Sequence, residues 1–149
     1  MNNTDSSELV KAMKIAYSTE FAFYLKAHFF HFNVEGSDFL EYHDLFGKIY
    51  EEVLDSIDPF GENIRKLGSY TPASFARLSM LSQIDDETQV PPKEAMVAEL
   101  LEDSGKIVRV LKLVYDLAER EGKHGLSNFL AERMDAHDKH AWFLRASLK

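Results

Sequence analysis

Four side chains in the first half of the chain have the types and spacing of metal ligands. His31 and His43 lie at comparable distances on either side of Gly36. If Gly36 marks the turn of an antiparallel helical hairpin, the two imidazoles sit at similar heights and approach each other. Asp58 and Glu62 follow one turn apart on one helix face. Imidazole nitrogens and carboxylate oxygens are the ligands expected for non-haem iron or zinc.

The distance between these two pairs determines how they can act together. Asp58 lies 15 residues beyond His43, which is about 22 Å along a helix at 1.5 Å per residue. One subunit therefore cannot bring all four side chains to one metal ion. In a two-fold dimer, an antiparallel partner would place its Asp58 and Glu62 opposite His31 and His43, which gives two equivalent sites per interface.

Long amphipathic segments must position these residues. Apolar residues recur at helical spacing, and 7 Gly and 4 Pro divide the chain. The pattern predicts helices over about 5–32, 38–67, 71–81, 93–121 and 126–148. Asp5 with Glu8, and Asp38 with Glu41, have the spacing of N-terminal capping pairs. Short turns and one long crossover favour an all-α, ferritin-like four-helix bundle with a short extra helix between the second and third long helices.

Composition limits the class of protein. A chain of 149 residues suits a single domain over 1–149. The lack of cysteine excludes disulfides, thiolate zinc sites, iron–sulfur clusters and thiol catalysis. A net charge of −8 disfavours nonspecific binding to DNA and to anionic membranes. No apolar run is long enough for a membrane span, and residues 1–8 do not resemble a secretory signal, so a cytoplasmic location is expected.

Beyond the ligand spacing, several motifs resemble the Dps proteins, or mini-ferritins. The resemblance covers nearly the whole chain. Its first part runs from His31 to Gly36, HFNVEG, and its last part comprises ERM at 132–134 and HDKHAWFLR at 137–145. Further matching positions lie between these two parts: Phe39, His43, Tyr50, Glu51, Asp58, Glu62, Ile64 and Arg65.

The resemblance implies a function. Dps proteins form dodecameric hollow shells that oxidise ferrous iron, preferably with hydrogen peroxide, and store the ferric product inside. Their ferroxidase sites lie between subunits, so His31, His43, Asp58 and Glu62 are expected as both iron ligands and catalytic residues. Zinc is expected only as a surrogate ion. The implied partners are further copies of the chain, ferrous iron and peroxide.

Three departures from the family pattern bear on that function. Gly47 stands where an acidic ligand is common, so one iron position is expected to be weaker. Phe32 replaces a frequent tryptophan beside the first histidine. Lys123, His124 and Asn128 stand near the expected three-fold pore, where aspartates are usual, so an acidic entry funnel is not supported.

Other polar residues have simpler expectations. His28 is expected to be an ordinary solvated or interface histidine rather than a ligand. His137 and His140 are expected to pack and form hydrogen bonds. Two acidic groups, Glu51, Glu52 and Asp55 and the run 85–87, are expected to be solvated faces. In a hollow shell, the alternative for some of them is to line the cavity as sites of mineral nucleation.

Several alternative functions remain. Di-iron bundles with both metals in one subunit use Glu-x-x-His within a helix, but the one match, Glu121 to His124, is interrupted by Gly122. A DNA-compacting protein is the second reading, although the charge disfavours it. The third reading is a passive metal-storage shell in which Gly47 has weakened oxidation.

Overall fold

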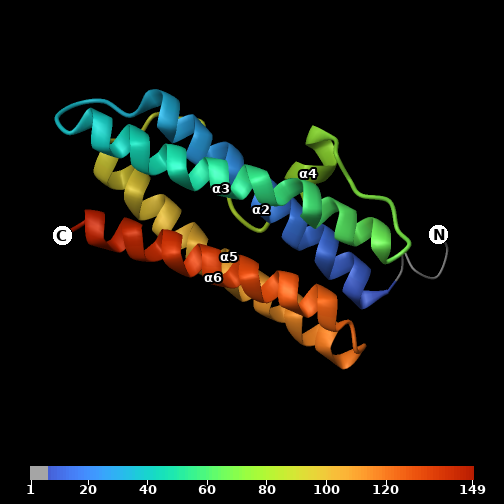
Figure 1. Ribbon diagram of the computed structural model, residues 1–149. Helices are drawn as coiled ribbons and strands as arrows, with labels where there is room; N and C mark the ends of the chain where they lie inside the picture. Colours follow the sequence, from blue (N-terminus) through green and yellow to red (C-terminus); the bar gives the residue numbers. More distant parts are fainter. Residues whose placement is uncertain (1–6) are drawn as a thin grey trace.

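The computed structural model describes residues 7–149, and in that range all regular structure is helical. Four long helices and one short helix follow one another, as the all-α prediction requires (Figure 1). Their bounds are α2 (Glu8–Asn33), α3 (Phe39–Lys66), α4 (Phe75–Leu81), α5 (Lys93–Arg120) and α6 (His124–Ser147).

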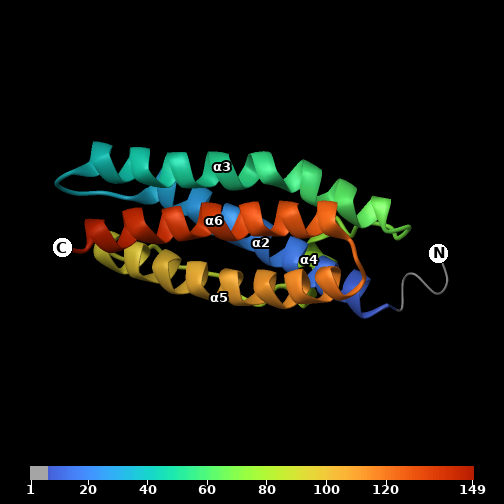
Figure 2. The same cartoon turned by 60° about the horizontal axis from the view of Figure 1, so that its bottom comes forward.

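The long helices form two hairpins packed against each other. The α2–α3 turn lies at the end of the bundle where the chain also finishes, and the α5–α6 turn lies at the opposite end (Figure 1). The crossover between the hairpins carries α4, which packs against α2. Figure 2 shows the same two hairpins from another side, with α3 and α6 running alongside each other. The predicted four-helix bundle with a short helix in the crossover is confirmed.

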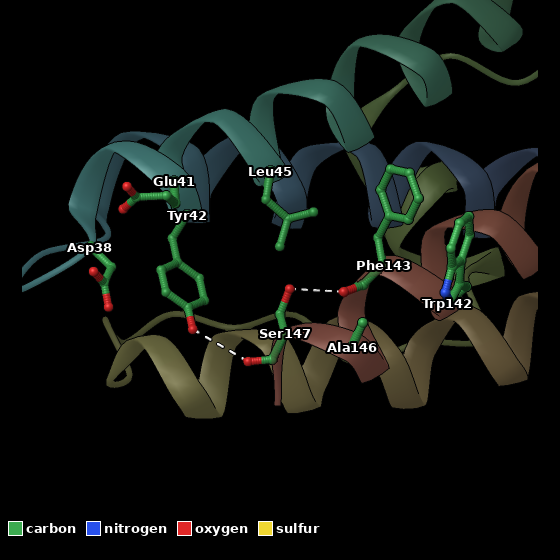
Figure 3. Close-up of a pocket in the computed structure, with 8 residues that line it drawn as sticks. All are labelled: Asp38, Glu41, Tyr42, Leu45, Trp142, Phe143, Ala146 and Ser147. Atoms are coloured by element: carbon green, nitrogen blue, oxygen red, sulfur yellow. Dashed lines mark hydrogen bonds between the residues drawn. The ribbon is translucent and has the colours of Figure 1, made fainter. Parts of the chain in front are cut away.

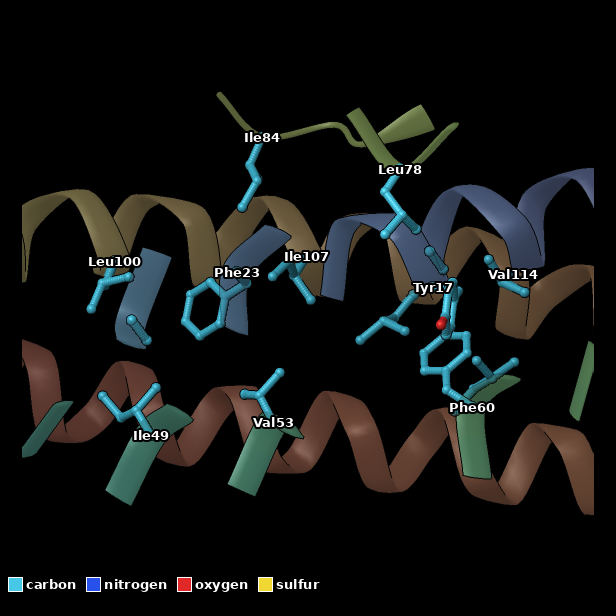
Figure 4. Close-up of a cluster of buried hydrophobic side chains, with 14 of the residues drawn as sticks. Tyr17, Phe23, Ile49, Val53, Phe60, Leu78, Ile84, Leu100, Ile107 and Val114 are labelled. Carbon is cyan, nitrogen blue, oxygen red and sulfur yellow. The ribbon is translucent and has the colours of Figure 1, made fainter. Parts of the chain in front are cut away.

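Apolar side chains from all four long helices fill the space between the hairpins. Phe23 of α2, Val53 of α3, Ile107 of α5 and Leu144 of α6 are fully buried. Figure 4 shows the first three meeting in the bundle centre. Each such side chain contributes roughly 1.5–3 kcal/mol on burial, so this core supports the hairpin that carries the histidine pair.

The beginnings of the first two helices differ from the predicted capping pairs. Asp5 lies outside the described residues, and α2 is capped by Ser7, whose Oγ accepts from the Val10 amide at 3.1 Å. The Asp38–Glu41 capping pair is wrong. Asp38 has a left-handed conformation with φ 64° and makes no side-chain cap bond. A capping residue normally has extended backbone angles, and the reversal after Gly36 does not leave Asp38 in that region.

Two later helices also begin away from the predicted positions. The short helix starts at Phe75 and is capped by Ser74, because the Thr71 hydroxyl instead donates to the Gly61 carbonyl of α3 at 2.7 Å. The last helix starts at His124, two residues before the predicted start. Among residues 7–149, no helix combines the length and the apolar character needed to cross a bilayer.

Candidate metal site

The α2–α3 hairpin brings His31 and His43 into direct contact. Their ring centroids lie 3.8 Å apart and the ring planes differ by 19°. Nδ1 of His31 lies 2.8 Å from the backbone oxygen of His43, and Nδ1 of His43 lies 2.7 Å from the backbone oxygen of His31. The expected approach of the two histidines is therefore present in the structure.

These reciprocal bonds determine which ring nitrogen carries the proton. A carbonyl oxygen accepts only, so Nδ1–H must donate in both rings. A neutral imidazole then has its lone pair on Nε2, the atom left for a metal ion. Metal-bound histidines commonly hold their other N–H on a carbonyl in this way. The pair thus fits a transition-metal ion, with two fixed neutral nitrogen donors.

Gly47 allows the His31 ring to lie against α3. A Cβ atom at position 47 would lie 3.1 Å from Nδ1 and 3.2 Å from Cε1 of His31. That separation is shorter than an ordinary van der Waals contact, so any larger residue would have to displace the ring. Gly47, which stands where the family commonly has an acidic ligand, is therefore also the residue that lets the His31 ring pack closely against α3.

His28 extends the aromatic contacts on the same side of α2. Its ring is stacked on Tyr50 at 3.8 Å and 7° and on Phe32 at 4.4 Å and 20°. Its Nδ1 forms a 2.9 Å hydrogen bond with the Tyr24 hydroxyl. Burial lowers the pKa of His28, and the repulsion that a protonated His31 would exert adds to this effect. The structure thus gives His28 a packed position rather than a freely solvated one.

Asp58 and Glu62 lie on the later part of α3, away from the histidine pair. Both are exposed. Tyr17, near the start of α2, has its pKa raised by burial and by the negative charge of Asp58. Within residues 7–149, no three His, Asp or Glu side chains are grouped so that they could hold a metal ion. One described chain therefore brings together only the two histidines of the four predicted ligands.

A second polar cluster lies inside the bundle. Glu20 of α2, Glu52 of α3 and Arg133, His137 and His140 of α6 form one network, in which Arg133 bonds to both carboxylates. His140 Nε2 lies 2.8 Å from Glu52, and His137 Nε2 lies 2.5 Å from Glu20. The packing role expected for the two histidines is confirmed. The expectation that Glu52 belongs to a solvated face is wrong, because it pairs with a buried guanidinium.

The charges in this cluster offset its burial. Burial alone would raise the pKa of Glu20, but the charges and hydrogen bonds of His137 and Arg133 bring it below its ordinary value. Burial would also raise the pKa of Glu52, but hydrogen bonds from His140 and Arg133 lower it to about 2. Burial lowers the pKa of His140 despite its bond to Glu52. Both carboxylates are therefore ionised near neutral pH.

A surface hollow at the end of the bundle that carries the α2–α3 turn does not have the composition of a catalytic site. It has a volume of about 620 Å³ and lies between the start of α3 and the end of α6 (Figure 3). Tyr42 and Ser147 join its two sides by a 3.4 Å hydrogen bond, and its lining includes no histidine. Trp142, also in the lining, is 57% exposed, so it is not a core residue of the single chain.

Comparisons with known proteins agree with this fold. A family model for the ferritin-like domain matches residues 10–149. The chain belongs to the ferritin-like family. Within that family its resemblance is to Dps proteins. The DNA protection during starvation protein of Helicobacter pylori (strain J99) is 29% identical over 126 residues, which cover 84% of this chain and 88% of that protein.

Solved structures give the same assignment. A Dps protein from Bacillus brevis matches with a TM-score of 0.93 and 25% identity, over 100% of both chains. The Dps protein of Vibrio cholerae O1 matches with a TM-score of 0.92 and 25% identity, over 98% of this chain and 92% of that one. It is described as a member of a broad superfamily of ferritin-like diiron-carboxylate proteins. The predicted resemblance to the Dps proteins is confirmed.

Proposed function

We propose that the protein oxidises ferrous iron, preferably with hydrogen peroxide, at sites shared by two subunits, and stores the ferric product in a hollow shell. The observation that carries this proposal is the His31–His43 pair. Both rings are held by Nδ1, so both Nε2 atoms are available, while Asp58 and Glu62 of the same chain lie too far along α3 to complete the site. The description of the Vibrio cholerae relative as a diiron-carboxylate protein supports iron as the substrate.

In this proposal the protein binds and orients the reactants. His31 and His43 supply neutral nitrogen donors, and Asp58 and Glu62 of a neighbouring subunit supply negative charge that stabilises the ferric product. Two ferrous ions give one electron each, and one peroxide molecule takes both electrons and two protons to form two water molecules. Oxidising equivalents are thus consumed in pairs without release of a hydroxyl radical. Zinc has no support from the comparisons and serves only as a probe ion.

The experiment that tests the shared site is complementation between two damaged chains. His31→Ala and Asp58→Ala should each abolish most ferrous oxidation by peroxide. In mixed shells refolded from equal amounts of both variants, half of the two-fold pairs contain one of each chain. Each such pair regains one intact site, so roughly a quarter of the wild-type rate should return. Verified mixed shells with no recovery would count against the proposal.

The proposed assembly is a homo-oligomer of twelve chains built from two-fold dimers. Apolar side chains on α4 and α2 support a covered surface there, since Phe75 is 85%, Met80 67% and Leu25 48% exposed in the single chain. Size-exclusion chromatography with light scattering should give about twelve times the 17.1 kDa chain mass. A monomer that still binds iron tightly would contradict the shared site.

A passive storage shell is the alternative that Gly47 favours, because it removes one carboxylate ligand. Peroxide consumption separates the two functions. A shell that oxidises iron should consume one peroxide molecule for every two ferrous ions. A passive shell should take up iron with no fixed ratio between the iron bound and the peroxide consumed. A cytoplasmic location, as for a protein acting on cellular iron, completes the proposal.

A further inference from the structure

Three aromatic side chains lie beside His31 at the candidate metal site. Tyr24 and His28 are one turn apart on α2, and Tyr50 lies next to them on α3. The Tyr24 hydroxyl and Nδ1 of His28 are 2.9 Å apart. The centroids of the His28 and Tyr50 rings lie 6.0 and 5.0 Å from that of His31. The proposed oxidation at His31 and His43 has given none of these three residues a part.

The chemistry of the two groups determines the direction of the bond between Tyr24 and His28. A phenol is a much stronger acid than a neutral imidazole N–H, and an imidazole nitrogen is a much stronger base than a phenol oxygen. The Tyr24 hydroxyl therefore donates to Nδ1 of His28. A tyrosine that loses an electron becomes a very strong acid, so even a histidine whose pKa is lowered by burial takes its proton. Tyr24 thus has its proton acceptor already in place.

The two rings stacked on His28 cannot use that acceptor. Tyr50 and Phe32 lie nearly parallel to the imidazole, at 7° and 20°. A ring nitrogen accepts a proton in the plane of its ring, so the hydroxyl of a stacked tyrosine is not aligned with it, and phenylalanine has no hydroxyl. The stack instead joins Tyr24 to His31 by a continuous series of ring contacts, along which an electron can pass.

The expected weakness of the second iron position creates a need for another electron donor. Hydrogen peroxide takes two electrons and two protons to become two water molecules, and a site that holds one ferrous ion supplies one electron. That single electron would convert peroxide to a hydroxide ion and a hydroxyl radical. Gly47 is the residue expected to leave sites in this half-loaded state, so an oxidisable side chain close to His31 would have a function there.

We propose that Tyr24 is the second electron donor to peroxide at a site that holds one ferrous ion, with His28 as its proton acceptor. Iron gives one electron and Tyr24 the other, while the hydroxyl proton moves to Nδ1 of His28. With two protons from solvent, the peroxide becomes two water molecules. The other products are ferric iron, the Tyr24 phenoxyl radical and protonated His28. A later ferrous ion returns an electron to Tyr24, and the proton moves back.

This inference rests on the proposed function, and its test uses limiting iron. The anaerobic assembly receives one Fe²⁺ per chain and then one peroxide, and samples frozen at early times are examined by EPR. Wild type should show a phenoxyl radical, whose signal narrows when the protein contains ring-deuterated tyrosine. Tyr24→Phe should lose most of this signal and give a several-fold larger yield of spin-trapped hydroxyl radical. Tyr115→Phe, a matched control in the last turns of α5, should keep the wild-type signal.

A second variant tests the proton acceptor. His28→Phe keeps an aromatic ring in the stack and leaves Tyr24 in place, but it removes Nδ1, so the radical yield should fall several-fold. Anaerobic Fe²⁺ titration of each variant sets the iron added, so that weaker binding does not imitate loss of the radical.

Three results would overturn the inference while leaving the proposed function standing. Wild type could consume one peroxide per two ferrous ions and yet form no phenoxyl radical at limiting iron. The radical could persist in Tyr24→Phe, or its yield could be undiminished in His28→Phe. If wild type consumes no peroxide with ferrous iron, the proposed function fails and this inference fails with it.

Discussion

Nδ1 of His31 and Nδ1 of His43 each donate to the backbone carbonyl of the other residue, at 2.8 and 2.7 Å. The same two bonds that join α2 to α3 therefore orient both rings. Binding of a metal ion to Nε2 requires no change of tautomer, so little reorganisation opposes it. Only a short turn around Gly36 separates the end of α2 at Asn33 from the start of α3 at Phe39. This short connection keeps the two residues opposite each other.

The tautomers can be observed directly. In the metal-free assembly with ¹⁵N-labelled histidine, solid-state NMR of the neutral rings should show Nδ1 of His31 and His43 protonated and Nε2 unprotonated. Zn²⁺, used as a probe, should shift the Nε2 resonances of both residues and leave Nδ1 protonated. Protonated Nε2 atoms in the metal-free protein would contradict the assignment.

Substitution of Gly47 separates the effect of volume from that of charge. Gly47→Ala adds only a Cβ, which crowds the His31 ring, so ferrous binding to the histidine pair should weaken. Gly47→Asp adds the same crowding and a carboxylate, and we expect it to raise occupancy of the second iron position and to speed oxidation above the Ala variant. Both variants replace a helical Gly, which offsets the crowding by up to about 1 kcal/mol.

Titration of each variant with Fe²⁺ without oxygen checks this expectation. Equal affinities and equal rates for Gly47→Ala and Gly47→Asp would show that the added carboxylate does not reach the metal. Wild-type protein that already binds two ions per site with equal affinity would refute the role given to Gly47.

The buried cluster should contribute to stability far more than a surface ion pair does. Glu20→Gln removes the one fully buried carboxylate of the cluster, which leaves His137 without its anion and Arg133 with Glu52 alone, and loss of one partner from a buried pair costs about 3–5 kcal/mol. The matched control is Asp116→Asn, which removes an exposed i,i+4 pair with Lys112 and should change stability by less than about 1 kcal/mol. Urea unfolding of both variants gives the comparison, and equal losses would contradict it.

Glu52 makes the stability dependent on acid pH. Its pKa is about 2 in the folded chain against an ordinary value of 4.5, so the folded state binds its proton less readily than the unfolded state. The contribution is full above pH 4.5 and is lost as the pH falls toward 2. Because the side chain is 39% exposed, solvent screening reduces the contribution to about 1 kcal/mol.

Thermal unfolding between pH 6 and pH 3 measures that contribution. Glu52→Gln should show a smaller fall in Tm over this range than wild type. Glu102→Gln, which removes an exposed carboxylate paired with Lys106, should keep the wild-type slope. A wild-type slope in Glu52→Gln would show that other groups determine the acid sensitivity.

DNA binding is expected to be weak despite the name of the Helicobacter pylori relative. A net charge of −8 opposes the phosphate contacts that supply nonspecific affinity. The assembled protein should not retard linear DNA at physiological salt in a mobility assay. Retardation at micromolar protein that disappears as salt is raised would reveal an exposed basic surface and contradict this prediction.

The sequence predicted the helices and the histidine pair because both follow from local spacing. Apolar periodicity gave the long helices to within a few residues, and the position of Gly36 between His31 and His43 implied that they meet. The expected shared site with Asp58 and Glu62 stays a prediction, since it needs a second chain.

The internal cluster could not be predicted, because it joins residues from three helices. A signal was nevertheless available: Glu20 lies on the apolar face that also carries Ala16, Phe23 and Ala27, all buried. A carboxylate on such a face requires a cation, and Arg133 is the one that meets it. The prediction that Asp38 caps α3 was wrong for a different reason. The backbone angles of Asp38 are determined by the turn that precedes it, and its spacing to Glu41 carries no information about that turn.

Trp142 lies in the wall of the hollow between α3 and α6 and is more than half exposed in the single chain. It is also the only tryptophan of the protein. Its fluorescence therefore reports on the solvent at this surface rather than on the packing of the core. A dissociated, folded chain should emit at long wavelength, and a shift to shorter wavelength on association would show that a neighbour covers the hollow. The chain thus carries an intrinsic optical probe of its assembly.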